Sequence, residues 1–207
     1  MLSTSLYEWV DLGLPSGLKW AAWNVGATKP EEYGLYFAWG ETQGYTGITD
    51  NKKFSWSDYK WCNGSNTTLT KYNNNSSYGT VDNLSSLTAS DDAASAAQST
   101  CRIPTKAEFE ELAANTTSAW TNNYNGRDVK GMIFTSKVEG YTDKSIFVPA
   151  SGGCSDGSLG NTSSNGYCWS SSLLEGISRV SWSLYFNSAS MGVGGYDRCY
   201  GRSVRAV

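Results

Sequence analysis

The chain has 207 residues and a net charge of −3, from 16 Lys and Arg against 19 Asp and Glu. This length suits one domain of ordinary size, and the lack of a basic excess argues against a surface that neutralises many phosphates, so we expect no nucleic-acid partner. The sequence contains no histidine, which excludes Ser-His-Asp and Cys-His triads and HExxH zinc sites.

The first forty residues predict three short strands. Tyr7–Val10 is followed by the turn sequence GLPSG, Leu18–Val25 is apolar between two glycines, and Leu35–Trp39 is a further apolar run. Residues 41–90 then lose hydrophobic periodicity and mix Asn, Ser, Thr and Gly with aromatic residues. We therefore expect a long irregular insertion there, ordered by its aromatic side chains.

Two helices are predicted in the middle of the chain. Asp91 and Asp92 precede the alanine-rich run Ala93–Gln98, and acidic residues at a helix start complement the helix dipole. A second helix follows Pro104, because Thr105 and Glu108 have the spacing of a capping box. The apolar residues that share one face of this second helix are Phe109, Leu112 and Ala113.

Beyond Asn115 and the threonines that end the second helix, the chain predicts strands separated by Gly, Asn and Ser clusters. These strands are expected at Val129–Thr135, Ser145–Pro149, Tyr167–Ser171, Arg179–Phe186 and Arg202–Val207. Early strands, two middle helices and a strand-rich second half indicate an α+β fold with short antiparallel sheets, rather than alternating βαβ units.

The strand near residue 184 predicts a sheet with two different faces. Alternation directs Trp182, Leu184 and Phe186 to the core, and directs Ser183, Tyr185 and Asn187 to the opposite side. The following stretch, Ser188–Gly201, is glycine-rich, irregular and carries two tyrosines. It is either a binding surface or a locally packed hairpin, and we favour the binding surface.

Patterns for catalysis and metal binding are weak. A glycosidase needs two carboxylates set across a sugar ring, but Glu108, Glu110 and Glu111 fall on the second helix, where capping and solvation explain them. No calcium-loop spacing occurs among the acidic residues, and none of the five cysteines has CxxC spacing, so we interpret most of them as free thiols. We expect no catalytic residue, no metal and no cofactor, and we do not expect an enzyme.

Hydropathy predicts no membrane insertion. No segment approaches the roughly 18 to 20 apolar residues of a membrane span. Met1–Val10 lacks the basic and apolar regions of a secretory signal, so we expect no leader within the given chain.

Several segments, taken in order, resemble a known family. They are Tyr7–Trp20 (YEWVDLGLPSGLKW), Asn24–Ala27 (NVGA), Tyr36–Thr42 (YFAWGET), Arg102–Phe109 (RIPTKAEF), Trp169–Ser172 (WSSS) and Ser203–Val207 (SVRAV). Together they are similar to the major paralogous domain of Fibrobacter and Bacteroides-type gut bacteria, over nearly the whole chain. The resemblance implies a single C-type lectin-like domain over residues 1–207, in the formylglycine-generating-enzyme-like branch, with adjacent termini and with Tyr7–Val10 paired near Ser203–Val207.

A subset of such domains are the variable proteins of diversity-generating retroelements, in which an error-prone reverse transcriptase rewrites the 3′ end of the gene. Adenine mutagenesis turns AAC codons into NNC, which never encodes Met, Trp, Lys, Glu or Gln. The resemblance therefore implies a variable region at about residues 183–200, with Trp182 and Met191 as fixed framework. Most residues of this region are compatible with NNC codons. Those that we predict to bind the ligand are Tyr185, Asn187, Ser190, Gly192, Gly194, Gly195, Tyr196, Asp197, Cys199 and Tyr200.

The resemblance thus implies a monomeric ligand-binding domain of receptor or adhesin type. It would recognise an unknown protein or cell-surface ligand from a bacterial cell surface or a phage virion. Nine Trp and 13 Tyr beside abundant Gly, Ser and Asn suit such a surface. The alternative is a non-variable carbohydrate-binding or adhesion domain of a gut bacterium, anchored by Trp56, Tyr59 and Trp61. An enzyme of the formylglycine-generating branch would need a designed cysteine pair, which Cys168 and Cys199 do not suggest.

Overall fold

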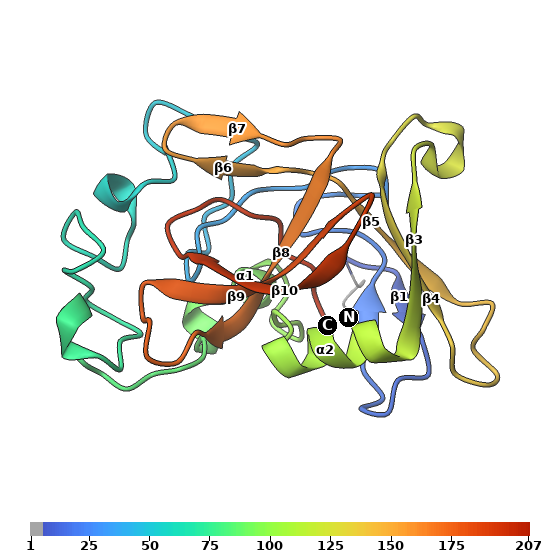
Figure 1. Cartoon of the computed structure of the whole chain (residues 1–207), viewed down its shortest axis with the longest axis horizontal. Helices are drawn as coiled ribbons and strands as arrows, with labels where there is room; N and C mark the ends of the chain where they lie inside the picture. The colour runs from blue at the N-terminus through green and yellow to red at the C-terminus, as the bar shows by residue number, and fades with distance from the viewer. Residues whose placement is uncertain (1–5) are drawn as a thin grey trace, which may run out of the picture.

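Short strands and two helices make up most of the regular structure of residues 6–207, the part of the chain that the computed structural model describes (Figure 1). The strands form four small antiparallel sheets, β1-β2, β10-β9-β8, β3-β4-β5 and β6-β7, which confirms the expected α+β class. The strands are β1 (Trp9–Asp11), β2 (Lys19–Ala21), β3 (Thr116–Thr121), β4 (Gly131–Ser136), β5 (Ser145–Pro149), β6 (Gly153–Ser155), β7 (Ser158–Gly160), β8 (Asn165–Leu173), β9 (Val180–Asn187) and β10 (Met191–Asp197). The helices are α1 (Ala93–Ala97), α2 (Lys106–Asn115) and the 3-10 turns η1 (Trp56–Asp58), η2 (Ser76–Tyr78), η3 (Ala89–Asp91) and η4 (Tyr124–Gly126).

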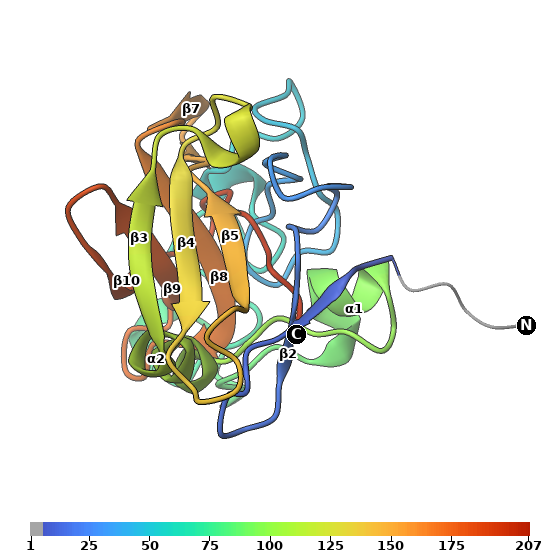
Figure 2. The same ribbon diagram turned by 90° about the vertical axis from the view of Figure 1, so that its right-hand side faces the viewer.

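The two three-stranded sheets enclose one apolar core, with α2 across one end (Figure 2). Sheet β3-β4-β5 contributes Phe134 and Val148, and sheet β10-β9-β8 contributes Leu184 and Phe186. The rings of Phe134 and Phe186 meet edge to face, with their centroids 6.2 Å apart. This core fixes one face of the sheet β10-β9-β8 and leaves its other face for a different role.

Helix α2 begins at the capping box that the sequence predicts. The Thr105 hydroxyl accepts a hydrogen bond from the Glu108 amide, and the Glu108 carboxylate accepts one from the Thr105 amide. Arg102 donates two further hydrogen bonds to this carboxylate, at 2.7 and 2.6 Å. Glu108 therefore joins the helix start to the preceding segment.

We expect Glu108→Gln to lower the free energy of unfolding by about 1 kcal/mol at neutral pH, because the amide loses the charge-assisted bonds to Arg102. Burial raises the pKa of the Glu108 carboxyl, but the hydrogen bonds from Arg102 and Thr105 outweigh burial and lower it overall. The stabilisation is thus full above the ordinary glutamate pKa of about 4.3 and is lost as the pH falls through the lower folded-state pKa. Urea unfolding of the variant and the parent across this pH range measures the loss of stability.

Glu110→Gln, at an exposed pair with Lys106, is the matched control and should change stability little. A penalty for Glu108→Gln that persists in acid would contradict this account.

The C-terminal residues form backbone hydrogen bonds with the N-terminal part of the fold. The amides of Ala21 and Val25 donate to the carbonyl oxygens of Ala206 and Val204, at 3.0 and 2.9 Å. The resemblance implies that Tyr7–Val10 pairs near this segment, whereas β1 itself pairs with β2, and Ala21 at the end of β2 bonds to Ala206. Tyr7 nevertheless packs in the same apolar cluster as Val204 and Ala206.

Residues 41–90 contain no strand or α-helix, and buried contacts order them. Arg198, just after β10, is fully buried beneath them. Its guanidinium donates hydrogen bonds to the carbonyl oxygens of Lys71, Tyr72 and Ser178. The aromatic side chains that this segment buries are Phe54, Tyr59 and Tyr72. One arginine thus links the irregular segment to the sheet.

The stretch expected to be irregular after residue 187 is mostly a strand. β10 pairs with β9 along its whole length, from Met191 opposite Phe186 to Asp197 opposite Val180. At the connecting turn, the Asn187 side-chain oxygen accepts hydrogen bonds from the amides of Ala189 and Ser190. The predicted binding segment is therefore a β-hairpin whose backbone is held by a sheet.

Within residues 6–207, no helix has both the length and the apolar character of a membrane span.

Candidate binding face

The two-faced pattern predicted for β9 is present in its second half. Leu184 and Phe186 are buried in the core between the sheets, whereas Tyr185 and Asn187 are only half-buried on the other side. The prediction is wrong for Trp182 and Ser183. Trp182 is half-buried beside the start of α2, and Ser183 is fully buried.

The burial of Trp182 and Ser183 is the reverse of the prediction, and the cause is local. The Ser183 hydroxyl donates to the carbonyl oxygens of Cys168 and Leu184, which satisfies a small polar group inside the protein. The Trp182 ring lies 4.8 Å from the ammonium nitrogen of Lys106 and packs against α2. The register between β8 and β9 also shifts between Trp169 and Leu173, so simple alternation does not describe this end of the sheet.

Tyrosines and glycines occupy neighbouring positions on one face of the sheet. Tyr167 of β8 stands opposite Tyr185 of β9, which in turn stands opposite Gly192 of β10. Gly194 and Tyr196 follow Gly192 at two-residue intervals and so lie on the same face. We call these five residues the tyrosine face. All five are half-buried.

The two glycines of the tyrosine face leave room for larger side chains. A Cβ atom at Gly192 would lie 3.6 Å from the Tyr185 ring, and one at Gly194 would lie 3.4 Å from the Tyr196 ring, both at or beyond ordinary contact distance. The ring of Tyr196 meets that of Tyr167 edge-on, with centroids 5.5 Å apart. The hydroxyl groups of Tyr185 and Ser190 are 2.9 Å apart, so the hairpin turn supports the outer tyrosine.

The remaining predicted residues fall into three groups. Asn187 and Ser190 form the hairpin turn next to the tyrosine face. Gly195 and Asp197 lie on the opposite phase of β10, where Asp197 forms an ion pair with Arg179. Cys199 has no exposed surface and packs against aromatic residues, so it contributes nothing to a contact surface. Its place in the predicted binding set is thus wrong, because the chain turns inward after β10.

Tyr200 lies beside the tyrosine face at a small cavity of about 220 Å³. This cavity opens between the β6–β7 hairpin and the sheet, and Tyr167, Tyr196 and Arg202 also line it. Tyr167 and Arg202 are absent from the sequence-predicted set. Their positions depend on the register of β8 against β9 and on the path of the chain after β10, which a local pattern does not contain.

The aromatic residues of the carbohydrate-binding alternative make internal contacts. The Tyr59 hydroxyl donates to the Trp39 carbonyl oxygen, and the Trp61 indole donates to the Gly40 carbonyl oxygen, both at 2.7 Å. The Trp56 ring packs edge-on against Tyr59, with centroids 5.6 Å apart. These contacts hold the 41–90 segment in place.

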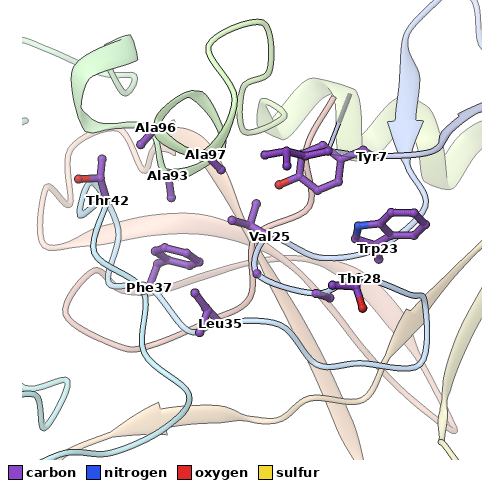
Figure 3. Close-up of a pocket in the computed structure, with 14 residues that line it drawn as sticks. Tyr7, Trp23, Val25, Thr28, Leu35, Phe37, Thr42, Ala93, Ala96 and Ala97 are labelled. Atoms are coloured by element: carbon purple, nitrogen blue, oxygen red, sulfur yellow. The ribbon is translucent and has the colours of Figure 1, made fainter. Parts of the chain in front are cut away.

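A second, larger cavity lies at the N-terminal side of the molecule (Figure 3). Its volume is about 680 Å³, and its walls are mostly apolar. Figure 3 shows Tyr7 and Trp23 on one side, Ala93 and Ala97 of α1 on another, and Phe37 below. No residue of the tyrosine face borders this cavity, so the two features are separate.

Cysteines and acidic residues assemble no metal-binding group within residues 6–207. All five cysteines are free thiols, and Cys168 and Cys199 belong to different apolar clusters. Burial raises the pKa of Cys168 to about 11 and that of Cys154 to about 12, so both are protonated at neutral pH.

The fold and this face define an α+β protein with a three-stranded sheet that is apolar on one side and rich in tyrosine and glycine on the other. No protein-family model, no curated protein and no solved structure matches the chain.

Proposed function

We propose that this chain is a C-type lectin-like variable protein of a diversity-generating retroelement, which binds a protein or cell-surface ligand through the tyrosine face and the adjoining hairpin turn. One observation carries the proposal. Along β9 and β10, the residues compatible with NNC codons include Tyr185, Gly192, Gly194 and Tyr196, which share one half-buried face. On the opposite face, Leu184, Phe186, Met191 and Val193 pack in the core between the sheets.

The energetics of the hairpin support this proposal. Backbone hydrogen bonds along β9 and β10, together with the inward side chains Leu184 and Phe186, fix the sheet independently of its outward residues. Outward substitutions therefore change stability little, typically by less than about 0.5 kcal/mol each. Tyrosines give rigid contact area at low entropic cost, and glycines leave space for a partner, as in antibody loops.

A comparison of two libraries tests whether the face tolerates diversity. One library carries NNC codons at Tyr185, Asn187, Ser190, Gly192, Gly194 and Tyr196, and the control library carries them at Gly166, Cys168, Leu184, Phe186, Met191 and Val193. Most outward variants should fold, whereas inward variants should fail. Truncating a buried side chain such as Leu184 or Phe186 costs about 2 to 5 kcal/mol, and Gly166 has no room for a larger residue. Protease resistance of displayed variants measures the folded fraction in each library. Equal fractions in the two libraries would contradict the proposal.

Binding itself is tested by exchange between natural sister proteins. Sequence differences among sister isolates should concentrate at the outward positions, and a template repeat with adenines at those codons should lie beside a reverse-transcriptase gene. Grafting the six outward residues of one sister onto another should transfer its preference within a panel of target cells. Differences spread evenly over the chain, or a graft that leaves target preference unchanged, would refute the proposed function.

A further inference from the structure

Arg202 lies in the wall of the small cavity beside the tyrosine face. Only 5% of its surface is exposed. The carbon of its guanidinium lies 3.9 Å from the ring centroids of both Tyr167 and Tyr196, and 5.3 Å from that of Trp169. These aromatic rings stabilise the positive charge of the guanidinium.

The hydrogen bonding of Arg202 differs from that of the two neighbouring buried arginines. Arg205 donates to the side-chain oxygen of Asn24 and to the carbonyl oxygens of Ala21 and Phe147. Both terminal nitrogens of Arg198 donate to carbonyl oxygens, so that only its Nε atom has no partner within residues 6–207. The Nε and Nη1 atoms of Arg202 are buried and have no hydrogen-bond partner within residues 6–207. Buried donors are normally satisfied, so this pair indicates a missing acceptor.

The charge of Arg202 is also unpaired. Within the described residues it forms no salt bridge, and Asp197, the acidic residue nearest in sequence, pairs with Arg179 on the opposite phase of β10. Burial lowers the pKa of Arg202 to about 10, which keeps the guanidinium protonated at neutral pH. The cavity wall therefore contains a cation, two of whose nitrogens are buried and have no hydrogen-bond partner among residues 6–207.

We propose that Arg202 binds a carboxylate of the ligand, and that this carboxylate is an Asp or Glu side chain of a protein partner. A planar guanidinium matches a carboxylate in its own plane. The rings of Tyr167 and Tyr196, which meet at 78°, lie against two sides of the guanidinium and line the same cavity. The cavity, at about 220 Å³, is smaller than the roughly 300 to 1,000 Å³ of pockets for whole small-molecule ligands, so it suits one protruding side chain.

This inference rests on the proposed function for the identity of the partner, and it assigns different roles to fixed and variable residues. Arg202 lies outside the predicted variable set, whereas Tyr196 belongs to it. A fixed cation would supply a common anchor for acidic partners, and the surrounding diversified side chains would select among them.

The test follows the N–H resonances of the Arg202 side chain by NMR in the intact wild-type protein, assigned by comparison with Arg202→Lys. Sodium acetate and N-acetylglutamate should each shift the Arg202 Nε–H signal saturably, whereas sodium chloride at equal ionic strength should not. Arg202→Lys should weaken acetate binding, followed through the Tyr167 and Tyr196 ring signals, by about tenfold, because it keeps the charge but loses the planar donor pair. Arg179→Lys, the same substitution at a partly exposed arginine outside the cavity, is the matched control and should bind acetate as the parent does.

The outcomes separate this inference from the proposed function. No shift of the Arg202 signal with acetate or N-acetylglutamate would overturn the carboxylate site, whatever the tyrosine face binds. A shift with glucuronate alone would overturn the assignment to a protein side chain and would indicate an acidic sugar. If acetate binds normally but the graft of outward residues leaves target preference unchanged, the proposed function is refuted and the carboxylate site remains.

Discussion

Gly166→Ala is expected to lower the free energy of unfolding by about 3 kcal/mol, although it adds a single methyl group. A Cβ atom at Gly166 would lie 1.9 Å from Cζ of Phe186, its partner across β8 and β9. Phe186 is fully buried against Phe134 and cannot move aside without disturbing the core. Urea unfolding of the variant and the parent measures the difference.

Gly192→Ala is the matched control, because it adds the same group on the other face of the same sheet. Its Cβ atom would lie 3.6 Å from the Tyr185 ring, which is ordinary contact, so stability should change by less than about 0.5 kcal/mol. Similar effects of the two substitutions would mean that the sheet does not have one closed and one open face.

Arg198→Met is expected to cost about 3 to 5 kcal/mol, a large part of the stability of an ordinary domain. The substitution leaves the carbonyl oxygens of Lys71, Tyr72 and Ser178 without their donor in a buried site. Because these bonds hold the 41–90 segment, limited proteolysis should cut that segment first, and thermal unfolding should report the overall loss.

Arg179→Met is the control for Arg198→Met. Its side chain is 37% exposed and pairs with Asp197, and partly exposed ion pairs contribute about 1 kcal/mol or less. The segment 41–90 should therefore stay resistant to protease in this variant. Equal losses in the two variants would show that Arg198 does not hold the segment.

Local sequence signals predict the elements that local physics determines. The capping box of Thr105 and Glu108 locates the start of α2, and the strand predicted at Ser145–Pro149 has the observed bounds of β5. β3 was not predicted, because its threonines were interpreted only as the end of the helix, although Thr116 begins a strand that pairs with β4. β10 was not predicted either. Its glycines have low strand propensity, and its pairing with β9 determines its conformation.

The candidate site was predictable only in part, for a related reason. Alternation along one strand places Tyr185 outward, and the structure agrees. Tyr167 and Arg202 reach the site through register and through the path of the chain, which involve residues far apart in sequence. Cys199 was misplaced because the composition of a segment does not show where the chain turns into the core.

The segment 198–207 bonds to several earlier parts of the chain, among them Phe37, Val25, Ala21 and Arg102. During synthesis all of these partners leave the ribosome before the segment that completes their hydrogen bonds. The nascent chain therefore exposes apolar surface until that segment emerges, and we expect it to depend on a chaperone such as a holdase during that interval. A substitution upstream of residue 198 therefore acts on a chain whose last hydrogen-bonded segment has not yet emerged.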